Sequence, residues 1–270
     1  MKKIIIVFLL IIGTVSLFGQ QISGTVFDKS SDIPVEYVNI GIVGKNVGTL
    51  SDQNGKYTLQ VNPDHYGDTL KFSCIGYHSY SAKVSDFVTM NNGNVNLEKR
   101  FYDLSEVVVR PKNTKERTLG ITQRSRSQLA LDYGTGHEFG IIISNKETVL
   151  IKELNVNIAY ISFDTTFFRV NIYKIHEDKQ FENILISPIY INVSKHEIIG
   201  DKITIDLREH YIVVEGDFLV TFENLKNLGK GYFSFYVSSR HRTYMRRTSQ
   251  GTWETHDSGI GISVLVDVER

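Results

Sequence analysis

Residues 21–96 decide the fold of the N-terminal part of the chain. Between them, segments such as residues 22–27 and 56–61 alternate apolar and polar side chains with the period of two that is typical of β-strands. The Asn54-Gly55 pair favours a tight hairpin, because both residues tolerate positive φ. The pattern predicts a small β-sandwich with little helix. Five short groups of residues occur along this stretch: Gly24-Thr25-Val26, Ile33-Pro34, Gly48-Thr49-Leu50-Ser51-Asp52, Asn54-Gly55-Lys56-Tyr57 and Ile75-Gly76-Tyr77.

These groups form an ordered series of motifs that resembles the carboxypeptidase regulatory-like domain, a module common in exported proteins of the Bacteroidetes type. The resemblance covers about residues 21–109 and implies a transthyretin-like sandwich of about seven strands without catalytic residues of its own. The motifs that carry it are Gly24-Thr25-Val26-x-Asp28, Ile33-Pro34-x-x-x-Val38-x-Ile40, Gly48-Thr49-x-x-Asp52-x-x-Gly55-x-Tyr57-x-Leu59, Phe72-x-x-Ile75-Gly76-Tyr77 and Leu104-x-Glu106-Val107-Val108-Val109.

The chain departs from the usual setting of this module after Val109. In many relatives the module precedes a plug and a large transport barrel, whose strands need about 9–11 residues each. The remaining residues continue with Arg110-Pro111-Lys112-Asn113 and are too few for both parts. The resemblance therefore does not imply a transport function for this chain. It does not imply peptidase activity either, because the module is named for its position beside a catalytic domain.

The N-terminus predicts a cleaved signal peptide at residues 1–19. Lys2 and Lys3 form a short positive region, residues 4–18 are almost all apolar, and Gly19 offers a small residue for cleavage. The apolar run is shorter than the roughly 20 residues that span a bilayer, which disfavours an uncleaved anchor. We therefore expect an exported protein of the periplasm or outer-membrane surface, with no transmembrane span after cleavage.

Charge and cysteine content limit the possible partners. The chain has 30 basic and 30 acidic residues, so no overall field attracts nucleic acid, and we expect no nucleic-acid partner. Cys74 is the single cysteine and lies in an apolar run, so we expect a buried, inert thiol and no intramolecular disulfide. We expect no cofactor and no metal.

The composition changes between the two halves of the chain. Residues 98–128 carry eight Lys or Arg against four acids, contain Pro111 and lose apolar periodicity after Val109. Such a stretch is typical of a solvated linker. We therefore predict four parts: the signal peptide, a regulatory-like sandwich at residues 20–97, a basic linker at residues 98–128 and a second domain at residues 129–270.

Alternation resumes in the second domain over six segments. One apolar face per strand is what a two-sheet core requires, so the pattern predicts a second antiparallel sandwich of jelly-roll type. A small membrane barrel would also alternate, but most of these segments are shorter than a tilted membrane strand. Solubility of this domain without detergent would eliminate the barrel. The inward residues are Leu154, Val156 and Ile158; Phe168, Val170 and Ile172; Ile203, Ile205 and Leu207; Phe218, Val220 and Phe222; Phe233, Phe235 and Val237; and Ile262, Val264, Val266 and Val268.

The strongest candidate for ligand binding is a strip of arginines and aromatic residues near the C-terminus. Guanidinium groups bind carboxylate or phosphate in a bidentate manner, and flat aromatic faces can stack on a sugar ring. The alternative is a polar hairpin whose aromatic residues cover the edge of the sandwich. The residues of the strip are Arg240, Arg242, Tyr244, Arg246, Arg247 and Trp253.

Other constellations give weaker signals. If a ligand lies on a sheet instead, the outward residues Asn155, Asn157, Asn171 and Tyr173 would form the sugar platform. Asp52-Gln53-Asn54-Gly55 resembles the start of a calcium loop but is explained by a turn. Glu254-Thr255-His256-Asp257 places two carboxylates beside an imidazole, which we interpret as an exposed loop.

Enzymatic activity has little support in the sequence. It contains no Gly-x-Ser-x-Gly and no His-Glu-x-x-His motif, and its eight histidines are scattered. A glycosidase-type carboxylate pair can come from distant strands, so the linear sequence leaves that alternative open. We therefore expect a non-catalytic envelope protein that binds a protein partner, and as the alternative a glycan-binding accessory protein that uses the strip.

Overall fold

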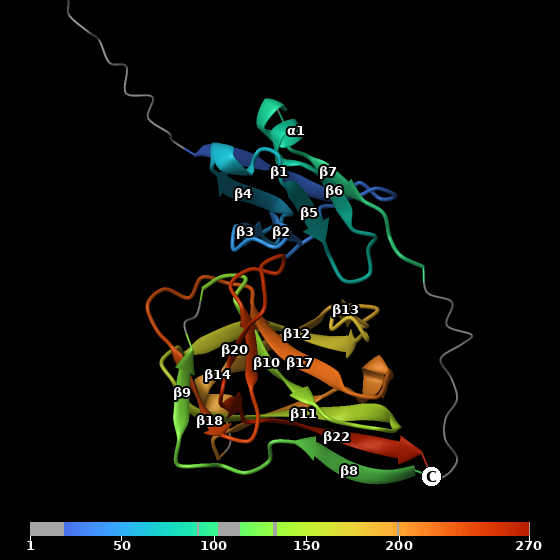
Figure 1. Cartoon of the computed structure of the whole chain (residues 1–270), viewed down its shortest axis with the longest axis vertical. Coiled ribbons are helices and arrows are strands. Elements are labelled where there is room, and N and C mark those ends of the chain that lie inside the picture. Colours follow the sequence, from blue (N-terminus) through green and yellow to red (C-terminus); the bar gives the residue numbers. More distant parts are fainter. Residues whose placement is uncertain (1–18, 91, 102–113, 132–133, 199, 270) are drawn as a thin grey trace, which may run out of the picture.

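The structure, a computed structural model, describes residues 19–90, 92–101, 114–131, 134–198 and 200–269. The predicted signal peptide, apart from Gly19, lies outside the described residues, as does the motif at residues 104–109. The described chain is all-β, as predicted, with a small N-terminal domain and a larger C-terminal sandwich of two sheets (Figure 1).

Seven strands, one 3-10 turn and one short α-helix build the described part of the N-terminal domain. Its two sheets have the strand orders β4-β1-β7 and β3-β2-β5-β6, with β7 parallel to β1. The elements are β1 (Gln20–Asp28), β2 (Asn39–Ile42), β3 (Gly48–Leu50), β4 (Lys56–Val61), η1 (Pro63–His65), β5 (Thr69–Ser73), β6 (Tyr80–Lys83), α1 (Val84–Thr89) and β7 (Val95–Leu97).

The core of this domain follows from the alternation. In β4, Tyr57, Leu59 and Val61 are buried while the residues between them are exposed. They pack with Val26 and Phe72, which are fully buried. The motif residue Gly24 lies so close to Gly93 that a Cβ atom would come within 2.3 Å of the Gly93 carbonyl oxygen, so this position requires glycine.

The Asp52–Gly55 turn forms, but it does not close the tight hairpin that we predicted. Gly55 has φ of 71°, and the Asp52 carboxylate accepts hydrogen bonds from the backbone N–H groups of Asn54 and Lys56. However, β3 and β4 belong to different sheets. The turn therefore carries the chain from one sheet of the sandwich to the other.

The motif residue Asp28 anchors the end of β1. Its side chain is 3% exposed and accepts hydrogen bonds from the Ser30 and Ser31 backbone, the Ser30 hydroxyl and the Tyr77 hydroxyl, while Lys99 Nζ lies 3.0 Å away. The Ser30 bonds and Lys99 outweigh burial and hold the pKa of Asp28 well below its usual range. Two motifs that are distant in sequence, those of Asp28 and Tyr77, thus meet at one carboxylate.

We expect Asp28→Asn to lower the free energy of unfolding by about 1.5–3 kcal/mol at pH 7, because hydrogen bonds to a charged acceptor are lost. The folded pKa lies below the unfolded one, so this stabilisation is complete above about pH 4 and disappears as the pH falls further. Urea unfolding at pH 7 and pH 3 measures it, with Asp64→Asn, at an exposed position, as the control. An equal difference from wild type at both pH values would contradict the assignment.

The C-terminal sandwich consists of a seven-stranded and an eight-stranded sheet. The first has the order β13-β12-β17-β10-β19-β20, with β14 beside β12; the second has the order β21-β18-β11-β22-β8, with β15 and β16 beside β11 and β9 beside β18. Its elements are β8 (Thr114–Gly120), β9 (Gln128–Leu131), β10 (Glu138–Ile143), β11 (Thr148–Ile161), β12 (Thr165–Ile175), β13 (Phe181–Asn183), β14 (Ile189–Ser194), η3 (Lys195–Glu197), β15 (Lys202–Asp206), η4 (Arg208–His210), β16 (Ile212–Glu215), β17 (Phe218–Asn224), β18 (Phe233–Ser238), β19 (Thr243–Arg246), β20 (Glu254–His256), β21 (Gly259–Ile260) and β22 (Ile262–Glu269).

All six predicted segments are strands, and their apolar residues build the core between the sheets. These segments are β11, β12, β15, β17, β18 and β22. Phe218, Val220, Phe233 and Val264 are fully buried there. The alternation thus predicted both the strands and the faces that pack together.

The stretch that we expected to be a linker contributes a strand to this domain. Residues 114–120 form β8 and pair with β22 from Glu269↔Thr114 to Ser263↔Gly120. β8 lies at the sheet edge and its residues are mostly exposed, so its composition resembles that of a solvated connector. The part of the predicted linker at residues 102–113 lies outside the described residues.

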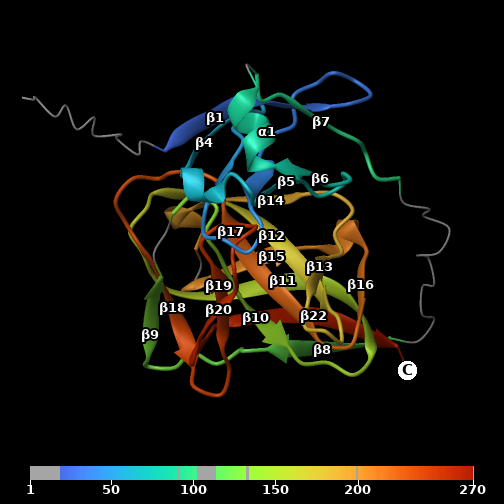
Figure 2. The same cartoon turned by 45° about the horizontal axis from the view of Figure 1, so that its top comes forward.

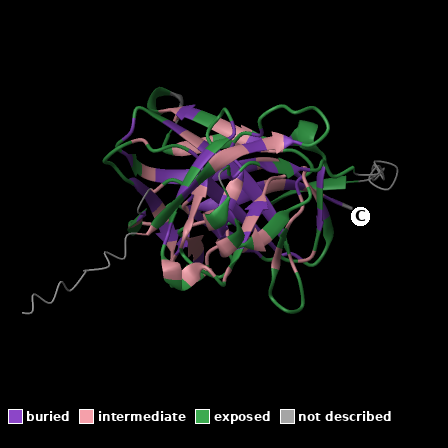
Figure 3. Cartoon of the chain, turned by 90° about the horizontal axis from the view of Figure 1, so that it is seen from above, coloured by how far each residue is buried: buried purple, intermediate pink, exposed green. Residues whose placement is uncertain are grey.

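The N-terminal domain covers the outer face of the seven-stranded sheet. Figures 1 and 2 show it resting over β12 and β17, with β2, β3 and β5 on the side of the sandwich. Purple buried segments run through the centre of the molecule in Figure 3. Among the described residues, no helix is long and apolar enough to cross a membrane.

Candidate functional site

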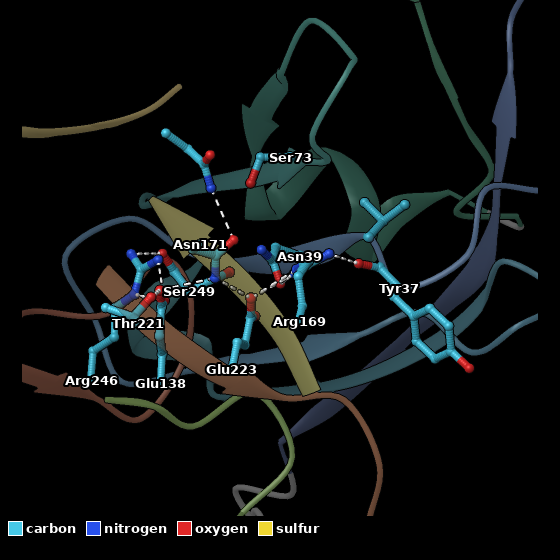
Figure 4. A network of polar contacts seen from close by, with 12 residues as sticks. Tyr37, Asn39, Ser73, Glu138, Arg169, Asn171, Thr221, Glu223, Arg246 and Ser249 are labelled. Atoms are coloured by element: carbon cyan, nitrogen blue, oxygen red, sulfur yellow. Dashed lines mark hydrogen bonds and ion pairs between the residues drawn. The ribbon is translucent and has the colours of Figure 1, made fainter. Parts of the chain in front are cut away.

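The outer face of the seven-stranded sheet carries a buried set of polar and charged side chains. Alternation turns these residues away from the core of the sandwich, yet Arg169 and Glu223 are fully buried and Glu138 is 1% exposed. Figure 4 shows them as a network that extends from β19 to the N-terminal domain. Charges are rarely buried in this way unless they are paired, so their partners decide what the surface does.

The first ion pair joins Arg169 of β12 to Glu223 of β17. Arg169 Nε and Nη2 donate to Glu223 Oε2 at 3.0 and 2.7 Å. The same guanidinium reaches into the N-terminal domain, where Nη1 donates to the Tyr37 carbonyl oxygen at 2.8 Å and Nη2 to Asn39 Oδ1 at 2.9 Å. One arginine therefore neutralises a buried carboxylate and holds the two domains together.

The second ion pair joins Arg246 of β19 to Glu138 of β10, with Nη2 2.6 Å from Oε2. Tyr173 and Thr221 donate to the other oxygen, and Asn171 bridges the two pairs by donating to Glu138 Oε1 and Glu223 Oε2. Burial would raise the pKa of Glu138, but Arg246 and these hydrogen bonds outweigh it and lower the pKa below its usual range. Glu138 therefore stays ionised.

Arg246 also fixes the loop between β19 and β20 against the N-terminal domain. It donates to the Ser249 carbonyl oxygen, and the next residue, Gln250, accepts from Gly44 N at 2.9 Å and donates to Ser73 Oγ at 2.8 Å. A Cβ atom at Gly41 would lie 3.1 Å from Gln250 Cβ, so glycine permits the close approach of this loop. We call Thr248–Gly251 the clasp loop.

The structure brings three residues of the predicted strip together. Tyr244, Arg246 and Trp253 lie on one face with Phe181: the Arg246 guanidinium is 4.4 Å from the centre of the Trp253 ring, and Phe181 contacts both Tyr244 and Trp253. Arg246 is engaged by Glu138 and the clasp loop, so it is not available to an external ligand. Arg240, Arg242 and Arg247 are exposed, and Arg242 lies 3.4 Å from Asp257.

The alternative sugar platform is wrong. Asn155 and Asn157 lie on β11 in the eight-stranded sheet, whereas Asn171 and Tyr173 lie on β12 in the other sheet, and all four are buried. Asn155 accepts from Thr204, and Asn171 and Tyr173 belong to the network under the N-terminal domain. The alternation placed them outward correctly, but other parts of the chain cover both faces.

Two of the remaining candidates differ from the prediction: the expected exposed loop at residues 254–257 contains strand β20, and Cys74, expected to be buried, is only partly buried. Glu254–His256 is strand β20 and is exposed, and Asp52 completes a turn. Desolvation raises the pKa of the Cys74 thiol to about 11, which keeps it protonated at neutral pH. No group of three His, Cys, Asp or Glu side chains suited to a metal occurs within the described ranges.

Sequence reasoning missed Arg169, Glu138 and Glu223, because a charge in an alternating strand predicts an outward side chain but not its partner. It also missed Tyr160 and Tyr232, which are 46% and 47% exposed. The only signal for the network was that single charges, Arg169 and Glu223, interrupt strongly apolar strands.

Comparison with known proteins identifies the N-terminal part. Residues 22–109 match the family model described as CarboxypepD_reg-like domain. This part of the chain is a CarboxypepD_reg-like domain. Over 110 residues the chain is 33% identical to TonB-dependent receptor P3 of Formosa agariphila. The aligned stretch covers 40% of this chain and 10% of the receptor.

Solved structures resemble the whole chain only distantly. The cysteine protease and lectin-like domains of Cwp84, a surface layer associated protein of Clostridium difficile, match 93% of this chain and 59% of their own with 8% identity and a TM-score of 0.35. A carbohydrate-binding module of the β-sandwich superfamily matches 81% of this chain and 90% of its own with 11% identity and a TM-score of 0.21. The chain thus spans a tenth of the receptor and little more than half of the Cwp84 structure.

We expect Arg169→Met to lower the free energy of unfolding by about 3–5 kcal/mol, because it leaves Glu223 buried without its counter-ion. Glu223 Oε1 already lacks a hydrogen-bond partner among the described residues, so little else can compensate. The double variant Arg169→Met/Glu223→Met should lose much less, because no unpaired charge remains.

Chemical denaturation measures the free energy of unfolding of each variant. The control is Lys174→Met, at an exposed position of the same strand. A double variant less stable than Arg169→Met would contradict the assignment of the loss to the unpaired Glu223 carboxylate.

Proposed function

We propose that this chain is an exported, non-catalytic protein of the cell envelope whose two domains act together as one protein-interaction module. The observation that carries the proposal is the Arg169 guanidinium, which pairs with Glu223 and donates to Tyr37 and Asn39 of the CarboxypepD_reg-like domain. A partner that binds this protein therefore meets a composite surface rather than two separate domains.

Two further observations support the envelope and the absence of catalysis. The relative of the CarboxypepD_reg-like domain is named as a TonB-dependent receptor, which favours an envelope location, at the periplasmic or the surface side of the outer membrane. The buried ionisable groups of the network are paired with one another: Glu138 with Arg246, and Glu223 with Arg169. Groups engaged in this way are poorly placed to transfer protons to a substrate.

Crosslinking in the native cells tests the module. We expect wild type to give a crosslinked adduct with an envelope protein, and Gly41→Val to reduce its yield several-fold, because the added side chain meets Gln250 and separates the clasp loop from β2. Gly67→Val is the control, since a Cβ at Gly67 meets nothing within 4 Å. Recovery of monomer alone from wild-type cells would contradict the proposal.

The second candidate function is glycan binding by the exposed part of the strip. Phe181, Tyr244 and Trp253 form a half-buried aromatic group on this face, and Arg242 and Arg247 are exposed in the same segment. Guanidinium groups beside aromatic rings suit an acidic sugar, because carboxylates bind them in a bidentate manner.

Retention on immobilised alginate and polygalacturonate tests this second function. Arg242→Ala/Arg247→Ala should reduce retention at least about tenfold, as expected for the loss of charge-assisted hydrogen bonds. Arg126→Ala removes an exposed arginine from the segment between β8 and β9 and should leave retention unchanged. Equal losses in both variants would indicate a nonspecific charge effect and reject the strip as a site.

A further inference from the structure

A pocket of about 210 Å³ opens on the eight-stranded sheet, outside both surfaces described above. Its walls come from the C-terminal end of β11 and from Lys195, Ile198 and Asp201. The lining residues are Ile158, Ala159, Tyr160, Ile161, Lys195, Ile198 and Asp201. Typical pockets for drug-sized ligands have about 300–1,000 Å³, so this one has room for a single small ring or the end of a chain.

A β-bulge in β11 creates one wall of the pocket. Ile158 pairs with Phe235 and Tyr160 with Ser234, so Ala159 is an additional residue and the register shifts. Regular alternation would turn Tyr160 to the same side as the buried Ile158. The extra residue turns it outward instead, and it is 46% exposed. Bulges re-aim side chains in this way at binding sites.

Tyr160 forms an exposed aromatic surface with Tyr232. Their ring centres are 5.2 Å apart with an interplanar angle of 31°. Tyr232 comes from the residue preceding β18, and its backbone N–H is held by the Ser162 hydroxyl at 2.8 Å. The two rings pack against each other at this angle, and each tyrosine keeps almost half of its surface in water, so both offer apolar area to a ligand.

Two charged residues, Lys195 and Asp201, also line the pocket. The Asp201 backbone oxygen accepts from Ile158 N at 2.8 Å, and its carboxylate lies 3.3 Å from the Tyr236 hydroxyl and 3.8 Å from Arg124. Lys195 Nζ lies 5.8 Å from the centre of the Tyr160 ring. The two charged lining residues have opposite signs, which favours an uncharged ligand rich in hydroxyl groups over an ion.

We propose that this pocket binds one ring of a neutral glycan. The apolar C–H face of the sugar packs on the electron-rich ring of Tyr160, which lines the pocket, and the Tyr232 ring packs against Tyr160 beside it. The sugar hydroxyls donate to the Asp201 carboxylate and accept from the Lys195 ammonium group.

An extended peptide would be the other candidate for this edge of β11, but the edge is too short for it. From Ile158 to Ile161, β11 pairs with β18, and Ile158 N already donates to Asp201. Strand addition depends on a run of main-chain hydrogen bonds, and Lys195 beside the edge opposes it further.

The site is independent of the proposed protein-interaction module and of the strip. The CarboxypepD_reg-like domain contacts β12 and the clasp loop, which belong to the other sheet or extend from it. The pocket therefore stays open while the two domains are joined.

The experiment measures retention of the purified full-length protein on immobilised neutral hexasaccharides of gluco, manno, galacto and xylo type. We expect wild type to bind at least one of them, and Tyr160→Ala and Tyr232→Ala to weaken that binding about tenfold or more. Asp201→Ala should also weaken it. Tyr211→Ala is the matched control, because Tyr211 is 57% exposed on the same domain.

Circular dichroism confirms that each variant is folded, and Tyr160→Phe, which keeps the ring, should retain binding even if Tyr160→Ala does not fold. Absence of binding to all four sugars overturns the proposal. So does an equal loss in Tyr211→Ala, capture of an alternating Thr-Val peptide in place of the sugars, or a loss that appears in Arg242→Ala/Arg247→Ala and not in the tyrosine variants. Failure of the crosslinking test leaves this outcome unaffected, so the two proposals are judged separately.

Discussion

The structure depends on two ion pairs on one face of a sheet, in which three of the four charged residues are buried. Arg169, Glu223, Glu138 and Arg246 lie on the outer face of the seven-stranded sheet, where they would meet water if nothing covered them. The CarboxypepD_reg-like domain covers the Arg169–Glu223 pair, and the clasp loop and Trp253 lie against Arg246. Buried ion pairs add little net stability compared with apolar residues of the same size, whereas an unpaired member is costly. The network therefore specifies how the domains meet more than it strengthens the contact, because an altered docking would leave Arg169 without the oxygens of Tyr37 and Asn39.

Glycines permit the same contact from the other side. Gly41 and Gly48 lie on the sheet of the small domain that meets the sandwich, and Gln250 and Thr248 of the clasp loop occupy the space where their side chains would be. Gly48 is also part of the motif that identifies the CarboxypepD_reg-like domain. Arg246 in turn holds the clasp loop through Ser249. A residue that we expected to bind a ligand thus acts inside the protein, because its charge is needed by Glu138.

The period of two made the strands predictable, since it depends on neighbours along the chain. Phe218, Val220 and Phe222 alternate with polar or smaller residues, and they do form β17 with its core face inward. What covers the outer face depends on residues more than a hundred positions away, such as Tyr37 for Arg169. Asn171 and Tyr173 were therefore expected on an open platform and are buried instead. The exposure of Tyr160 was not predictable for a different reason. The bulge at Ala159 reverses the alternation within β11, and the sequence has no glycine or proline there that would indicate a bulge.

The way the domains dock also limits where a protein partner can bind. The small domain uses the sheet β3-β2-β5-β6 and its loops toward the sandwich, through Asn39, Gly44 and Ser73. Its other sheet, β4-β1-β7, and helix α1 lie on the side away from the sandwich (Figure 1). Strand β4 is an edge strand whose outward residues Lys56, Thr58 and Gln60 are exposed. Edge strands offer unpaired backbone groups to a neighbouring chain. The composite surface that we propose for a protein partner therefore has its open backbone edge on the small domain. The pocket that we propose for a glycan lies on the eight-stranded sheet of the large domain. The partner and the glycan could therefore bind at the same time.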